Sequence, residues 1–76
     1  MFDSFRQIAK GKLRETNLTY AKLAAMVGVS EATIKQFMCG ASDSRRIAEL
    51  IADALNSELV YSNGTYLIKK QGDNQQ

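Results

Sequence analysis

The sequence predicts a small, mainly α-helical domain that ends in a β-hairpin. Apolar residues recur at helical spacing in four segments between residues 3 and 56, and beyond them strand-forming residues flank an Asn-Gly pair. With 76 residues, the chain has room for one domain. We expect that domain to span residues 1–70, and residues 71–76, which lack apolar anchors, to form a disordered tail.

The first helix is expected to begin at Asp3 or Ser4, either of which can act as its N-cap, and to stop near Asn17. Its apolar residues recur at helical spacing and form one face, which consists of Phe5, Ile8, Ala9 and Leu13. The segment therefore predicts an amphipathic helix that contributes to the core.

Two short helices follow, separated by a break at Gly28. Thr19 is expected to cap the second helix and Ser30 the third, which Gly40 ends. The predicted core residues are Leu23, Ala24 and Val27 in the second helix and Ile34 and Phe37 in the third. A lone glycine followed by an apolar residue and an N-cap lets the chain turn sharply while both helices share one core. The opposite face of the third helix should then point outward.

The fourth helix and the hairpin complete the predicted fold. The helix runs from about Ser44 to Asn56 and is expected to bury Ile47, Leu50, Ile51, Ala54 and Leu55. The hairpin spans residues 58–69, because Asn63-Gly64 suits a two-residue type I′ turn. Counting outward from this turn pairs Ser62 with Thr65, Tyr61 with Tyr66, Val60 with Leu67, Leu59 with Ile68, and Glu58 with Lys69.

Composition argues against several classes of function. No apolar run is long enough to span a membrane and the N-terminus lacks the order of a signal peptide, so we expect a cytoplasmic protein without membrane contact. Cys39 is the only cysteine and histidine is absent, which leaves no internal disulfide and no Cys/His metal site. Because no acid/base, nucleophile or metal set is assembled, we expect neither an enzyme nor a cofactor.

Charge is distributed unevenly along the chain. Residues 1–41 hold six Lys/Arg against three Asp/Glu (+3), whereas residues 42–76 hold four against five (−1). The basic bias therefore lies in the half that contains the two short helices.

These helices and the one after them resemble the helix-turn-helix DNA-binding domains of the phage repressor and Cro group, the XRE-like family. The resemblance covers about Arg6 to Asn56 and is carried by Leu23, Ala24, Gly28, Val29, Ser30, Thr33, Ile34 and Phe37, with "RRIAELIADAL" as the closing helix. It implies a four-helix repressor-like fold that binds double-stranded DNA at a pseudo-palindromic operator. The chain departs from the family at Tyr20, where members often have a phosphate-contacting Gln, and at "MCG", where they often read Glu-Asn-Gly or Glu-Lys-Gly.

If the third helix enters the major groove, its outward residues meet base edges. Gln36 can bond an adenine in bidentate fashion, Ala32 can touch a thymine methyl, and Glu31 can accept from a cytosine amino group. The expected DNA-backbone contacts are Thr19, Tyr20, Lys22, Ser30, Thr33, Lys35, Ser42, Ser44, Arg45 and Arg46. A simpler explanation of Glu31 is that its charge favours the N-terminus of its own helix.

The hairpin is apolar on both faces, which suggests a contact beyond its own core. Leu59, Tyr61, Tyr66 and Ile68 share one face, and Val60 and Leu67 occupy the other. We expect a homodimer that uses the first face and presents two recognition helices to a two-fold-related site. The alternative is that one face packs on the first and fourth helices of the same chain.

The resemblance predicts a sequence-specific transcriptional regulator, a Cro-like repressor of a phage or mobile element that occupies promoter DNA as a dimer. The main alternative is an antirepressor or repressor-partner module that binds a protein, which Tyr20 and Glu31 favour because they weaken the expected DNA contacts. A further alternative is an architectural excision factor that bends DNA for a recombinase.

Overall fold

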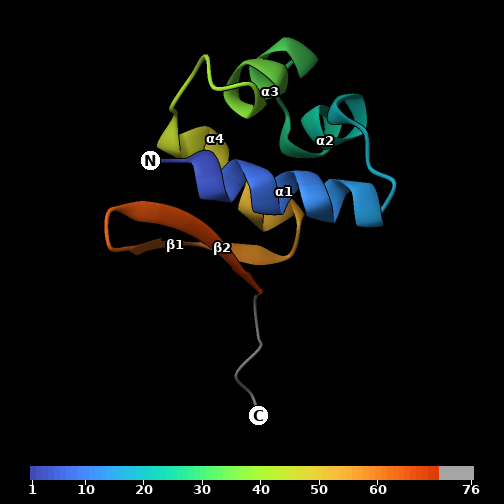
Figure 1. Ribbon diagram of the computed structural model, residues 1–76. Coiled ribbons are helices and arrows are strands. Elements are labelled where there is room, and N and C mark those ends of the chain that lie inside the picture. The colour runs from blue at the N-terminus through green and yellow to red at the C-terminus, as the bar shows by residue number, and fades with distance from the viewer. Residues whose placement is uncertain (71–76) are drawn as a thin grey trace.

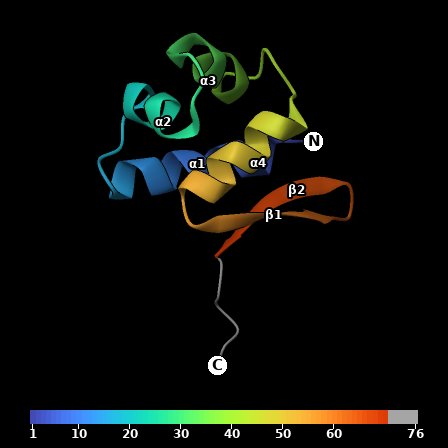
Figure 2. The ribbon, with the colours of Figure 1, turned by 180° about the vertical axis from the view of Figure 1, so that it is seen from behind.

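The computed structural model describes residues 1–70, and the tail predicted for residues 71–76 lies outside them. Four helices and one antiparallel hairpin form three levels: α2 and α3 at one end, α1 and α4 in the middle, and the hairpin at the other end (Figures 1 and 2). The elements are α1 (Asp3–Glu15), α2 (Tyr20–Val27), α3 (Glu31–Met38), α4 (Arg45–Ala54), β1 (Ser57–Ser62) and β2 (Thr65–Lys70). This architecture confirms the predicted fold class. Within residues 1–70, no helix has the length and apolar character needed to cross a membrane.

Two of the three predicted N-caps are confirmed, and Ser44 provides a further cap that was not predicted. The hydroxyl oxygens of Thr19 and Ser30 accept from backbone N–H groups three residues ahead, each at 3.1 Å, and that of Ser44 does so at 3.2 Å. The cap predicted for α1 is wrong, because the residue before that helix is Phe2, which forms no side-chain cap. Its ring is buried in the core, so the helix begins directly behind it at Asp3.

The break between α2 and α3 has the expected geometry. Gly28 adopts the left-handed conformation at φ 82°, and the N–H groups of Gly28 and Val29 both donate to the carbonyl of Ala24, at 2.9 and 3.1 Å. A Cβ at Gly28 would meet nothing within 4 Å, so backbone conformation rather than packing requires glycine here.

The core gathers side chains from all four helices and from the residue before them. Among its largest fully buried members are Phe2, Phe5, Leu23, Ile34, Phe37, Met38 and Ile51. On α4, burial of Ile47 and Ile51 is confirmed, whereas Leu50, Ala54 and Leu55 are only half-buried. Ala48 and Ala52 are buried instead, because their small side chains let the middle of α4 lie close to its neighbours.

The hairpin has the predicted register, extended by one pair between Ser57 and Lys70. Asn63 and Gly64 both have positive φ, at 51° and 78°, as a type I′ turn requires. β2 packs against α1, and β1 packs against α4. The hairpin therefore covers the side of the α1–α4 layer that faces away from α2 and α3 (Figures 1 and 2).

Candidate nucleic-acid interface

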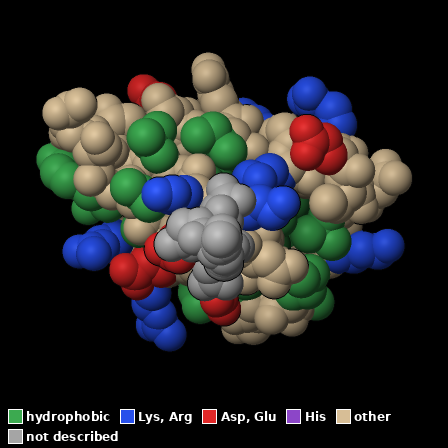
Figure 3. Space-filling model, turned by 90° about the horizontal axis from the view of Figure 1, so that it is seen from below, with side chains coloured by type: hydrophobic (Ala, Val, Ile, Leu, Met, Phe, Trp, Pro, Cys, Tyr) green, Lys and Arg blue, Asp and Glu red, His purple; other side chains and the backbone are tan. Residues whose placement is uncertain are grey.

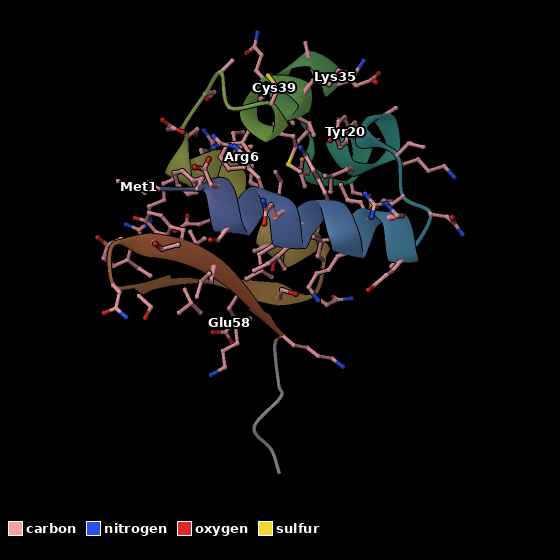
Figure 4. All side chains as sticks on the ribbon, viewed as in Figure 1. Met1, Arg6, Tyr20, Lys35, Cys39 and Glu58 are labelled. Atoms are coloured by element: carbon pink, nitrogen blue, oxygen red, sulfur yellow. The ribbon has the colours of Figure 1, made fainter. Side chains whose placement is uncertain are left out.

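The exposed face of α3 is the centre of the candidate site. Ile34, Phe37 and Met38 are buried and hold the helix against the core, which turns the remaining side chains outward. The exposed residues of this helix are Glu31, Ala32, Lys35 and Gln36. In Figure 4, Lys35 extends away from the rest of the molecule, at the end opposite the hairpin. The three predicted base-reading residues thus share one unobstructed surface.

Local bonds order the first turn of this helix. The hydroxyl groups of Ser30 and Thr33 lie 2.8 Å apart and share a hydrogen bond, in addition to the N-cap bond. Glu31 and Lys35 form an (i, i+4) ion pair of 3.2 Å with both side chains substantially exposed. Exposed pairs of this kind contribute about 0.3–0.5 kcal/mol, so DNA or another ligand can separate them at little cost.

A groove of about 360 Å³ runs beside α3 and brings together predicted contacts from two helices. Tyr20, Lys35 and Gln36 line it, with Lys10, Met38 and Cys39. Tyr20 is half-buried and packs against the core, so its ring forms a wall of the groove. Gln36 is exposed and lines the same groove.

The remaining predicted backbone contacts flank α3. Thr19 and Lys22 are exposed at the start of α2, and Arg45 and Arg46 are exposed at the start of α4. Arg45 pairs with Glu49 at 3.3 Å, and residues 1–70 supply no ion pair to Arg46. Ser42 and Ser44 are half-buried, and the Ser44 hydroxyl is engaged in capping α4. Two adjacent exposed cations therefore lie beside α3, at the start of α4.

Arg6 is a residue of the site that sequence analysis missed. It is buried, 8% exposed, and lies among α1, the end of α3 and the loop before α4 (Figure 4). Its position provides a signal, because it follows Phe2 by four residues and precedes Ala9 by three, on the apolar face of α1. A basic residue on such a face indicates a charge that has partners inside the fold.

The hairpin residues predicted to form a dimer interface fall into two groups that differ in burial. Leu59, Tyr66 and Ile68 pack against the core of their own chain, whereas Tyr61 is 59% exposed near the turn. The outer face carries the half-buried Val60 and Leu67. Figure 3 views this end of the molecule, where apolar side chains lie among charged ones. The alternative of packing on α1 and α4 therefore accounts for most of the predicted face.

Within the described part of the chain, no three His, Cys, Asp or Glu residues come together in a group able to hold a metal ion. Neither the protein-family models nor the curated proteins that were compared match this chain.

Proposed function

We propose that this protein is a sequence-specific, double-stranded DNA-binding transcriptional regulator, a Cro-like repressor of a phage or mobile element. The observation that carries the proposal is the exposed face of α3, backed by three buried side chains and flanked by Arg45 and Arg46. A helix held in this way can enter the major groove while flanking cations neutralise phosphates. Occupying promoter DNA would be sufficient for repression and requires no reaction.

In this proposal Gln36 reads an adenine, because its amide can donate and accept in one plane. Ala32 contacts a thymine methyl, and Glu31 accepts from a cytosine once its pair with Lys35 opens. Lys35 and the residues at the starts of α2 and α4 contact the DNA backbone.

Gln36→Ala should cost about 1–3 kcal/mol on the preferred site and relax selectivity at one base position, because a bidentate contact is lost. Glu31→Gln should instead raise non-specific affinity, since it removes a negative charge near the phosphates. The measurement is selection of bound duplexes from random DNA by wild type and both variants at one salt concentration. If all three folded proteins select the same motif with equal affinity, α3 does not read DNA.

We further propose that the regulator acts as a homodimer. α3 and the hairpin lie at opposite ends of the molecule (Figures 1 and 2), so a dimer across the outer hairpin face would point the two α3 helices in opposite directions. An edge-to-edge dimer would keep both helices on one side of a shared duplex. Pairing through a strand edge therefore suits a two-fold operator best.

Backbone hydrogen bonds distinguish the two edges of the hairpin. The N–H of Tyr66 donates to the carbonyl of Met1 at 3.0 Å, so part of the outer edge of β2 is engaged. Tyr61 lies opposite Tyr66, and at such a position the backbone groups of the two residues point to opposite outer edges. None of residues 1–70 outside the hairpin bonds to the backbone of Tyr61, which leaves the β1 edge open to a second copy.

Tyr61→Lys should shift the protein toward monomers without loss of helical content, because a charge is added at the β1 edge on a side chain that is 59% exposed. Sedimentation of the free and DNA-bound protein measures the shift. Thr65→Lys adds the same charge on β2 and should leave the dimer intact. A wild type that sediments as a monomer in both states would rule out this dimer.

The protein-binding alternative is favoured by one observation, the Glu31–Lys35 pair, which balances the charge of the outward face of α3. An antirepressor or repressor partner would show no enriched DNA motif and would lose binding to its protein partner when Gln36 or Glu31 is changed. An excision factor would bend the DNA it selects, which gel mobility of circularly permuted fragments can measure.

A further inference from the structure

Arg6 is the only charged residue that is buried within residues 1–70. Its Nε donates to the carbonyl of Phe37 at 2.6 Å, and its Nη2 donates to the carbonyl of Ser42 at 2.7 Å. Nη2 also reaches Oδ1 of Asp43 at 2.8 Å, and Nη1 reaches Oδ1 of Asp3 at 3.4 Å. The guanidinium therefore joins α1 to the last turn of α3 and to the loop before α4, which lie 31 to 37 positions further along the chain.

The contacts of Arg6 combine a helix-end carbonyl, an aromatic ring and two carboxylates. The Phe37 carbonyl also accepts from the N–H of Gly40 at 3.2 Å, so Arg6 supplies its second donor. Phe37 lies in the last turn of α3, where backbone carbonyls lack intrahelical donors and a cation interacts favourably with the helix dipole. The Phe37 ring packs against the guanidinium, with its centroid 4.8 Å from Cζ. The carboxylates of Asp43 and Asp3 are mostly exposed and balance the buried charge from the solvent side.

These contacts act on the segments that carry the candidate DNA contacts. Gln36 directly precedes Phe37, and its carbonyl accepts from the N–H groups of Ala41 and Ser42 at 2.9 and 3.2 Å. Ser42 and Asp43 lead directly into Ser44, the cap of α4, and then into Arg45 and Arg46. By holding the end of α3 and residues 42–43 together, one side chain couples the orientation of Gln36 to that of the arginine pair.

We propose that Arg6 is a positioning residue for DNA recognition, which fixes Gln36 and the start of α4 as one rigid unit. This inference rests on the proposed function. Arg6 does not itself contact DNA, because it is buried and each of its guanidinium nitrogens already has an acceptor within the chain. Arginine is required because its planar fork reaches acceptors in several directions, whereas the single ammonium of lysine cannot span them. Rigid presentation lowers the entropy lost when the site binds.

The test compares Arg6→Lys with wild type and with Arg14→Lys, a matched change on the exposed surface of α1. Arg6→Lys should lower affinity for the preferred duplex about tenfold, the equivalent of one charge-assisted hydrogen bond. It should also relax the preference at the base position that Gln36 reads and leave the preference at the position that Ala32 contacts unchanged. Backbone amide hydrogens of residues 40–44 should exchange with solvent faster. Arg14→Lys should change none of these.

A second variant, Asp43→Asn, removes the negative charge of a mostly exposed partner but keeps an oxygen that can accept from Arg6. Because this side chain is mostly exposed, the variant should fold even if Arg6→Lys does not. It should shift the same readouts in the same direction by a smaller amount. If wild type selects a motif and the folded variants keep that motif with unchanged loop exchange, Arg6 merely stabilises the fold and this inference fails. If wild type itself selects no motif, the proposed function fails, and the positioning role fails with it.

Discussion

Phe2→Ala is expected to lower the free energy of unfolding by about 3–5 kcal/mol, a large part of the stability of a domain of this size. The Phe2 ring is 1% exposed and stacks on Tyr66 of β2, with centroids 4.5 Å apart and planes 8° apart. It also forms edge-to-face contacts with the rings of Phe5 and Phe37, whose centroids lie 6.1 and 5.3 Å from its own. Truncation would therefore leave a cavity where the hairpin, α1 and α3 converge.

Urea denaturation followed by circular dichroism measures this loss. Tyr61→Ala is the matched control, because Tyr61 is also an aromatic residue but is 59% exposed, and its truncation should cost well under half as much. Phe2→Leu should fall between the two, since it keeps much of the buried volume. A loss below about 1 kcal/mol for Phe2→Ala would show that this ring does not connect the hairpin to the helices.

Replacing Arg45 and Arg46 together with alanine is expected to weaken DNA binding on all sequences and to reduce its dependence on salt. Two lost phosphate contacts should lower the slope of log affinity against log salt by roughly 2. Between 50 and 200 mM salt, that difference corresponds to about tenfold in affinity. In the wild type the Glu49 carboxylate pairs with Arg45, so the double substitution also leaves this negative charge without its cation near the DNA. The selected motif should remain the same, because phosphate contacts carry no base preference.

The matched control replaces Lys69 and Lys70 with alanine. It removes the same charge from β2, at the end of the molecule opposite α3 (Figure 1), and should change the slope much less. Titration of one fixed duplex at several salt concentrations provides both slopes. Equal slopes for wild type and the Arg45/Arg46 variant would remove this pair from the interface.

Local interactions explain which parts of this fold could be predicted. The caps at Thr19 and Ser30 each depend on a hydroxyl and an N–H three residues ahead, and the hairpin register follows from the conformational freedom of Asn63 and Gly64. Such features depend on a few neighbouring residues, so the sequence alone contains them. The outward face of α3 was predictable for the same reason, because its period follows from the helix itself.

The features that sequence analysis missed depend on groups far apart in the chain. Phe2 is buried because Phe37 and Tyr66, 35 and 64 positions later, supply rings against which it packs. As a result Phe2, which forms no side-chain cap, directly precedes α1. Arg6 can be buried only because Phe37, Ser42 and Asp43 bring acceptors to one point. Which hairpin face meets the core was likewise undecided, since both faces are apolar and α1 and α4 can cover only one. The residue pattern of this protein determined its helices, turns and strand register, whereas tertiary packing decided which apolar and charged side chains those elements would bury, because burial requires partners that only the folded chain assembles.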